Sequence, residues 1–137
     1  MTPAEFRKLA LALPGAEEHK HMDHPDFRVN GKIFATLGYP NEGWAMVKLY
    51  PDQQRDLEAV DPGVFVKLKG AWGRKGCTNV LLADAKPARV KAALHAAWRN
   101  AAVRTALQRV ELAQKAETTA ARKQSKSRAV LPARETS

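Results

Sequence analysis

Apolar residues recur at helical spacing near the start of the chain and predict a first helix. The stripe consists of Phe6, Leu9, Ala10 and Leu13. Thr2 and Glu5 have the spacing of a capping box, in which each side chain satisfies a backbone N–H at the helix start. Pro14 and Gly15 then end the helix.

Shorter apolar segments with strand character follow. Asn30-Gly31 is a strong hairpin signal because both residues tolerate a positive φ, and it separates two candidate strands at 27–29 and 32–37. Further strands are expected at 44–49, 64–68 and 78–82, the fourth with Val64, Val66 and Leu68 on one face. The polar stretch 19–25 is expected to be irregular.

Two more helices complete the pattern. One is expected at 51–60, between Pro51 and the Pro62-Gly63 stop. A long C-terminal helix is expected after a cap at Asp84, with an apolar face formed by Val90, Leu94, Ala97, Trp98 and Ala101. The order α-β-β-β-α-β-β-α predicts an α+β fold, an antiparallel sheet of about five strands with helices packed on one face. We expect one domain over residues 1–117 and a basic disordered tail over 118–137.

Charge is the most informative part of the composition. The chain carries 23 Lys and Arg against 14 Asp and Glu, a net +9. The tail contributes +4, so residues 1–117 still carry +5. Such an excess favours polyanionic partners. One cysteine, no long apolar run and no signal-peptide pattern favour a cytoplasmic protein with no membrane association.

The basic charge is concentrated in two places. Residues 67–76 form a glycine-rich stretch whose cations Lys67, Lys69, Arg74 and Lys75 can neutralise phosphates, while Trp72 offers an aromatic face to a base. The alternative is a solvated loop with Trp72 folded onto the core. The second place is the C-terminal run, including Arg99, Arg122 and Lys123, whose alternative is a solubilising tail. Lys48 would widen the basic surface.

Several segments in a fixed order resemble the MmcQ/YjbR family of small bacterial proteins. They are Leu-Pro-Gly-Ala-Glu-Glu at 13–18, Phe-Arg-Val-Asn-Gly-Lys-Ile-Phe-Ala at 27–35, the strand from Trp44 to Leu49, and residues 72–80. The resemblance covers roughly residues 2–100. It implies a frataxin-like, double-wing α+β fold and a DNA-binding role, and it adds Asn79 to the candidate site. Many relatives have Trp, Asn, Thr and Val in succession, whereas here Trp72 precedes Thr78-Asn79-Val80 by six residues.

Other chemistry is weakly indicated. His19, His21 and His24 offer imidazoles for a metal or small ligand, but without a defined metal-binding spacing. Cys77 follows two cations that would lower its pKa, yet no triad partner is recognisable. No nucleotide-binding, zinc-protease or kinase motif is present. The sequence therefore predicts a nucleic-acid-binding protein, most simply one that binds DNA. We expect it to be non-enzymatic and to carry no cofactor. The alternative is a protein-interaction module, for which an exposed apolar patch around Trp44 and Met46 would be the sign.

Overall fold

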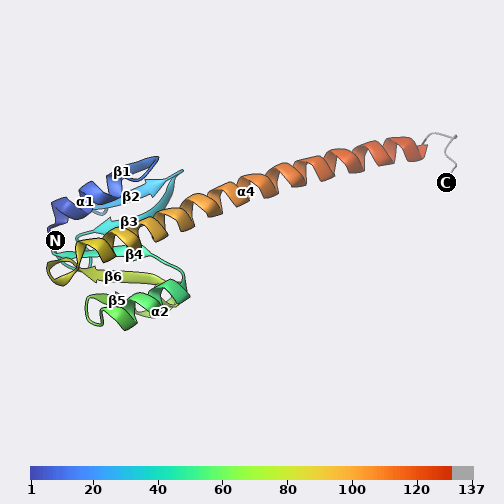
Figure 1. Ribbon diagram of the computed structural model, residues 1–137. Coiled ribbons are helices and arrows are strands. Elements are labelled where there is room, and N and C mark those ends of the chain that lie inside the picture. The colour runs from blue at the N-terminus through green and yellow to red at the C-terminus, as the bar shows by residue number, and fades with distance from the viewer. Residues whose placement is uncertain (131–137) are drawn as a thin grey trace. The chain divides into compact units, whose positions relative to one another are not determined.

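The fold is an α+β arrangement built on one antiparallel sheet (Figure 1). The computed structural model describes the backbone of residues 1–130 and the side chains of 1–104 and 106–115. The elements in chain order are α1 (Pro3–Leu11), β1 (Ala16–His21), β2 (His24–Val29), β3 (Lys32–Leu37), β4 (Trp44–Lys48), α2 (Pro51–Val60), β5 (Phe65–Lys67), α3 (Gly70–Arg74), β6 (Cys77–Leu81), a 3-10 turn η1 (Leu82–Asp84) and α4 (Pro87–Val130). The α+β class, α1 and α2 confirm the sequence-based predictions.

Local sequence signals account for much of this arrangement. Thr2 caps α1, since its hydroxyl accepts from the Glu5 N–H at 3.1 Å while the Glu5 carboxylate accepts from the Thr2 N–H at 3.3 Å. Asn30 and Gly31 have φ of 52° and 78° and close the tight turn between β2 and β3. The predicted hairpin is therefore confirmed, because both turn residues adopt the left-handed conformation that such a turn requires.

The sheet has six strands in the order β1-β2-β3-β4-β6-β5, and the prediction of an irregular segment at 19–25 was wrong. Its first part lies in β1, which pairs along its length with β2, and His21 lies opposite His24. The strand was missed because its sequence, Ala-Glu-Glu-His-Lys-His, has no apolar alternation and most of its side chains are exposed. Backbone pairing with β2, rather than burial, holds it in the sheet.

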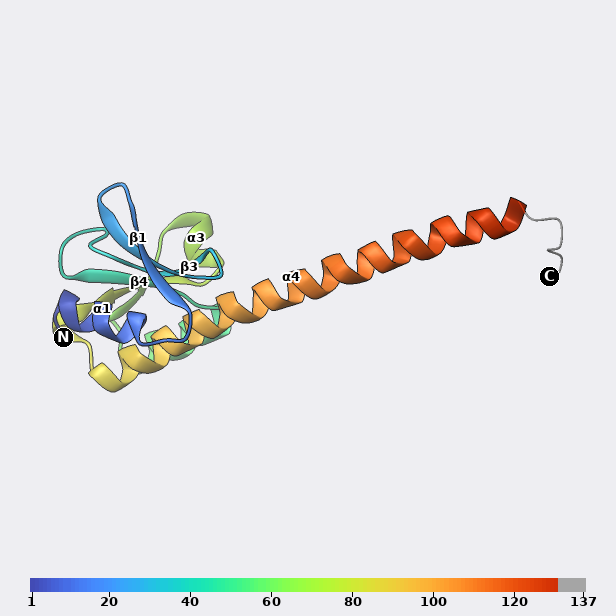
Figure 2. The same ribbon diagram turned by 90° about the horizontal axis from the view of Figure 1, so that it is seen from above.

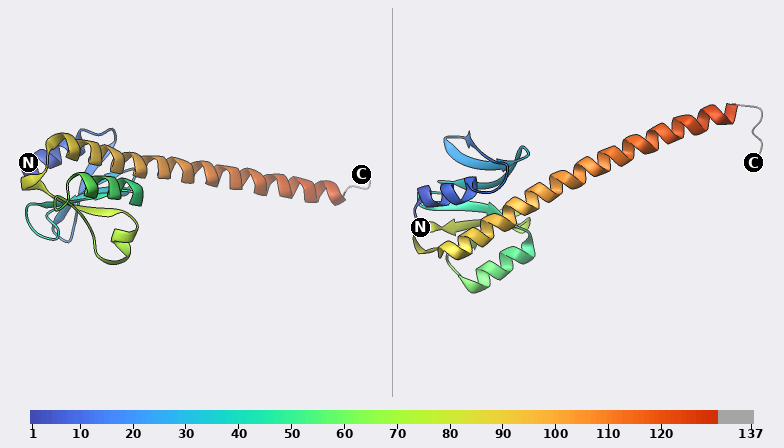
Figure 3. Two further views of the ribbon diagram at one scale, coloured as in Figure 1. Left: turned by 60° about the horizontal axis from the view of Figure 1, so that its bottom comes forward. Right: turned by 45° about the horizontal axis from the view of Figure 1, so that its top comes forward.

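Three helical segments cover one face of the sheet: α1, α2 and the first turns of α4 (Figure 3, right). The core lies between these layers. It contains Phe6 and Phe27 in edge-to-face contact, with centroids 6.1 Å apart, and the predicted α4 residues Val90, Leu94 and Ala97. Strand β5 is shorter than the predicted strand at 64–68, and its core residue is Phe65, whereas Val66 is 37% exposed. The prediction that Asp84 caps α4 was wrong, because Asp84 ends η1.

The predicted glycine-rich basic stretch at 67–76 contains a short helix, α3. This helix lies on the opposite side of the sheet from α1 and the first turns of α4 (Figure 2; Figure 3, left). The prediction that helices pack on one face therefore holds for α1, α2 and the start of α4, but not for α3. We call the side of the sheet away from α1, α2 and α4 the α3 face.

Helix α4 extends from Pro87 to Val130 and so includes part of the segment expected as a tail, 118–137, whereas residues 131–137 lie outside the described residues. The sequence over 101–130 is rich in Ala, Leu, Gln, Lys and Arg, which favour helix locally even without a core-facing stripe. The chain divides into two compact units, Met1–Val103 and Arg104–Ser137. The expected boundary between the domain and a disordered tail at residue 117 stays a prediction. Within the described residues, no helix is both long and apolar enough to cross a bilayer.

Candidate nucleic-acid interface

Trp72 on α3 is the centre of the candidate site. Its side chain is 60% exposed, so the alternative in which it folds onto the core is wrong. The ammonium of Lys48 lies 5.6 Å from the centroid of the indole ring, and that of Lys75 lies 5.7 Å from the same centroid. Both distances are within the range of cation–π attraction. The structure thus brings together two predicted cations from separate elements around one accessible aromatic ring.

Backbone hydrogen bonds between neighbouring segments create this juxtaposition. The N–H of Leu49, next to Lys48, donates to the carbonyl of Gly76 at 3.3 Å, and the N–H of Leu68 donates to the carbonyl of Cys77 at 3.2 Å. These bonds tie the ends of β4 and β5 to the start of β6. As a result, Lys48 and Lys75 are neighbours although they are 27 positions apart in the sequence.

Two glycines let the chain fold this tightly. A Cβ added to Gly73 would lie 1.7 Å from the carbonyl oxygen of Leu68, and one added to Gly76 would lie 1.9 Å from that of Leu49. Both residues are buried, and Gly76 has a φ of 112°. Their role is close packing of the chain. Gly70 is the exposed glycine of α3, with open space around its Cα.

We call α3 and its return into β6, residues 70–77, the Trp72 corner. Gln54 of α2 holds the backbone of this corner from inside the protein, and it was not identified from the sequence. Its side chain is only 3% exposed, and its amide nitrogen lies 3.1 Å from the Gly73 carbonyl, 3.0 Å from the Cys77 carbonyl and 3.1 Å from the Thr78 hydroxyl. The Thr78 hydroxyl donates in turn to the Gly76 carbonyl at 2.9 Å. A polar residue on the buried face of α2 was the available signal, because such a side chain needs hydrogen-bond partners.

The other predicted cations of this region surround Trp72 in sequence and are exposed: Lys67, Lys69 and Arg74. None of these three, nor Lys48 or Lys75, forms an ion pair within the described residues. Their charges are therefore not neutralised by carboxylates of the described chain. We call Lys48, Lys67, Lys69, Arg74 and Lys75 the basic cluster, although Lys67 pairs with Thr78 in the sheet, whereas Lys48 pairs with Cys77 on the opposite face.

Asn79 belongs to the same side of the molecule. Thr78 faces the helices because it contacts Gln54 of α2, so its neighbours Cys77 and Asn79 face the other way. Lys48 pairs with Cys77 across the sheet and shares this α3 face. The Asn79 side-chain oxygen is buried without a hydrogen-bond partner. It therefore does not offer an exposed base-reading oxygen.

The predicted C-terminal cations lie on α4. Arg99 lies exposed on α4. Arg122 and Lys123 are within the helical backbone, but their side chains lie outside the described residues. Their participation stays a prediction.

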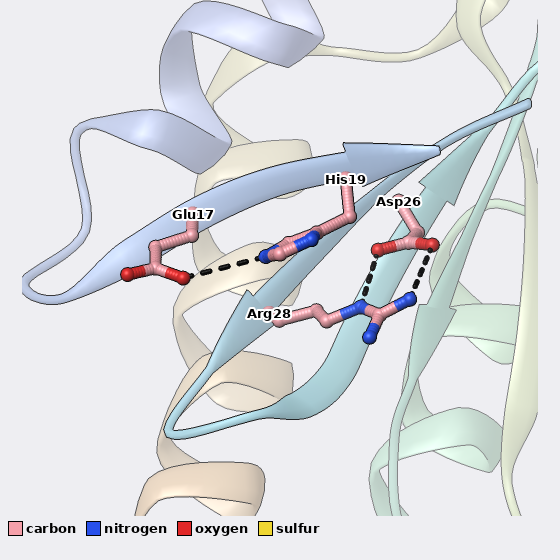
Figure 4. A network of polar contacts seen from close by, with 4 residues as sticks. All are labelled: Glu17, His19, Asp26 and Arg28. Atoms are coloured by element: carbon pink, nitrogen blue, oxygen red, sulfur yellow. Dashed lines mark hydrogen bonds and ion pairs between the residues drawn. The ribbon is translucent and has the colours of Figure 1, made fainter. Parts of the chain in front are cut away.

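A second polar group lies on β1 and β2 (Figure 4). Asp26 is 1% exposed and accepts from the Arg28 Nε at 2.8 Å and from its Nη2 at 3.2 Å. This contact raises the pKa of Arg28, so the guanidinium stays charged. Glu17 and His19, which lie opposite Arg28 and Asp26 on β1, contact each other at 3.3 Å. Since Asp26 neutralises Arg28, this group adds little net positive charge to the α3 face.

Cys77 is buried rather than poised for reaction. Burial raises the pKa of its thiol, while Lys48 and Lys75 act in the opposite direction without overcoming it. The predicted lowering by nearby cations is therefore present but is the smaller effect. A neutral, buried thiol is a packing residue.

The histidine hypothesis gains no support. His19 and His21 lie on β1, whereas His24 lies on β2 and packs its ring against Tyr39. In the part of the chain that the structure describes, no three His, Cys, Asp or Glu side chains are grouped as a metal would require. The apolar patch expected for a protein-interaction module is also not formed by its two named residues, because Met46 is buried and Trp44 is half-buried.

Comparison with known proteins supports the family suggested by the sequence motifs. A model of the YjbR family matches residues 11–100. The chain belongs to the YjbR family. No curated protein matches the chain. The YjbR match covers β1 to β6 and the first turns of α4, including Trp72 and the basic cluster, and leaves out the C-terminal part of α4.

Proposed function

We propose that this YjbR-family protein is a non-enzymatic nucleic-acid-binding protein whose main contact surface is the corner around Trp72. The observation that carries the proposal is an aromatic ring, 60% exposed, with the Lys48 and Lys75 ammonium groups within 6 Å of its centroid. An exposed aromatic ring can stack on a base, and the cations beside it can contact the phosphates. The net charge of +9 would add long-range attraction.

The basic cluster would contact phosphates, and Trp72 would contact a base. Arg99, Arg122 and Lys123 would widen the positive surface without reading sequence. Binding would be mainly electrostatic, because phosphate contacts position a protein on nucleic acid but carry no base information. DNA is the expected partner on the family resemblance.

The salt dependence of binding tests this proposal. With about four to six phosphate contacts, log K should fall with log salt by roughly 0.9 per contact for duplex DNA. The triple variant Lys69→Ala, Arg74→Ala, Lys75→Ala should reduce that slope and weaken binding. Its matched control, Lys8→Ala, Lys20→Ala, Lys91→Ala, removes the same charge from exposed positions outside the cluster. A flat salt response, or equal losses in the two triple variants, would contradict the proposed site.

A further inference from the structure

Trp72 lies on α3, whose backbone is held by buried contacts inside the protein. Gly73 packs against the Leu68 carbonyl, and the Gln54 amide binds the carbonyls of Gly73 and Cys77 from inside the protein. The α3 segment is five residues long and returns directly into β6.

The exposed ring suits a base that is not already stacked. Trp72 is 60% exposed, whereas the other two tryptophans are half-buried. In a duplex, both faces of a base are covered by neighbouring base pairs, so an indole can stack only after a step has been opened. A single strand offers unstacked bases without that cost, and base–aromatic stacking accepts any base.

The flanking lysines complete the same geometry. Lys48 and Lys75 reach the ring from different segments, β4 and the residue after α3, and neither is tied to a carboxylate within the described residues. Their ammonium groups are free to exchange contact with the ring for the phosphates on either side of a stacked nucleotide. Two cations beside one exposed ring therefore suit a stacked nucleotide and its adjacent phosphates.

Resting on the proposed function, we infer that the Trp72 corner binds single-stranded nucleic acid in preference to duplex. Single-stranded DNA and RNA would bind in the same way, with an unpaired base stacked on the Trp72 indole and the adjacent phosphates contacting Lys48 and Lys75. This contact is tolerant of sequence. Oligo(dT) and oligo(U) distinguish a DNA strand from an RNA strand carrying the same chemistry.

The test uses the full chain and fluorescein-labelled oligo(dT), oligo(U) and a mixed-sequence duplex of equal length, about 16 nucleotides. Anisotropy should give a lower Kd for at least one single strand than for the duplex. Trp72→Ala should weaken single-strand binding about tenfold, and Trp72→Phe should retain most of the affinity because it keeps an aromatic face. Lys48→Ala should weaken it more than Lys91→Ala, an exposed lysine of α4.

The outcomes separate the inference from the proposed function. Duplex binding as tight as single-strand binding, or single-strand binding unchanged in Trp72→Ala, overturns the inference and leaves electrostatic binding in place. Absence of binding to all three probes at low salt overturns both. Because Trp72 is exposed, Trp72→Ala should keep the wild-type circular dichroism spectrum, which makes a loss of affinity interpretable.

Discussion

Two segments of this protein look alike in sequence and behave differently in the structure. Residues 19–25 and 67–76 are both rich in polar residues, and each was a candidate binding site, the first for a metal and the second for nucleic acid. The first forms parts of β1 and β2, where His21 and His24 lie opposite each other, but no three metal-binding side chains of the described residues are grouped. The second forms α3 and a tight return, which gathers Trp72 and Lys75 beside Lys48.

The difference lies in what holds each segment. Backbone pairing orders the β1–β2 hairpin, and its side chains remain mostly exposed. The α3 corner is ordered from inside by buried glycines and by the Gln54 amide. A candidate site therefore forms where buried contacts fix the backbone beneath exposed functional groups.

The largest expected effect is at Gly73. Gly73→Ala should lower the free energy of unfolding by about 3 kcal/mol, since the added methyl group would collide with the Leu68 carbonyl and the backbone must shift. Urea denaturation measures the change. Gly70→Ala is the matched control in the same segment, with open space but a φ of 74°, and should lose about 1 kcal/mol. Equal losses would mean that close packing does not fix the corner.

A smaller loss is expected at Gln54. Gln54→Ala should destabilise the protein by about 2 kcal/mol, because the Gly73 and Cys77 carbonyls would lose a buried donor. It should also weaken nucleic-acid binding although Gln54 is buried and cannot contact a ligand directly. Arg55→Ala, an exposed neighbour on α2, serves as the control for both measurements. A loss below about 0.5 kcal/mol would show that the Gln54 hydrogen bonds do not stabilise the corner.

In the β1–β2 hairpin, by contrast, a substitution is expected to raise the free energy of unfolding. Met22 and Asp23 occupy its turn with φ of 51° and 65°, a conformation that favours Asn and Gly, as at Asn30-Gly31. The double variant Met22→Asn, Asp23→Gly should therefore raise the free energy of unfolding by about 1 kcal/mol without changing nucleic-acid affinity. Thermal unfolding and anisotropy measure the two quantities. A change in affinity would indicate that the hairpin takes part in binding after all.

Much of the fold could be predicted from local signals. The Thr2–Glu5 capping box, the Asn30-Gly31 turn and the Pro51 helix start each act over a few residues, so the sequence alone is sufficient. Strand β1 and helix α3 could not be predicted in this way. The former depends on pairing with β2, and the latter contains two glycines that disfavour an isolated helix.

The candidate site divides along the same line. The sequence by itself determined the family, the positive charge and the residue types of the basic stretch. Only the tertiary structure decided that Trp72 is exposed, that Lys48 joins Lys75 beside it, that Asn79 has its side-chain oxygen buried, and that Gln54 supports the corner. Charge and local conformation are properties of short segments, whereas exposure and cross-element contacts depend on how those segments pack.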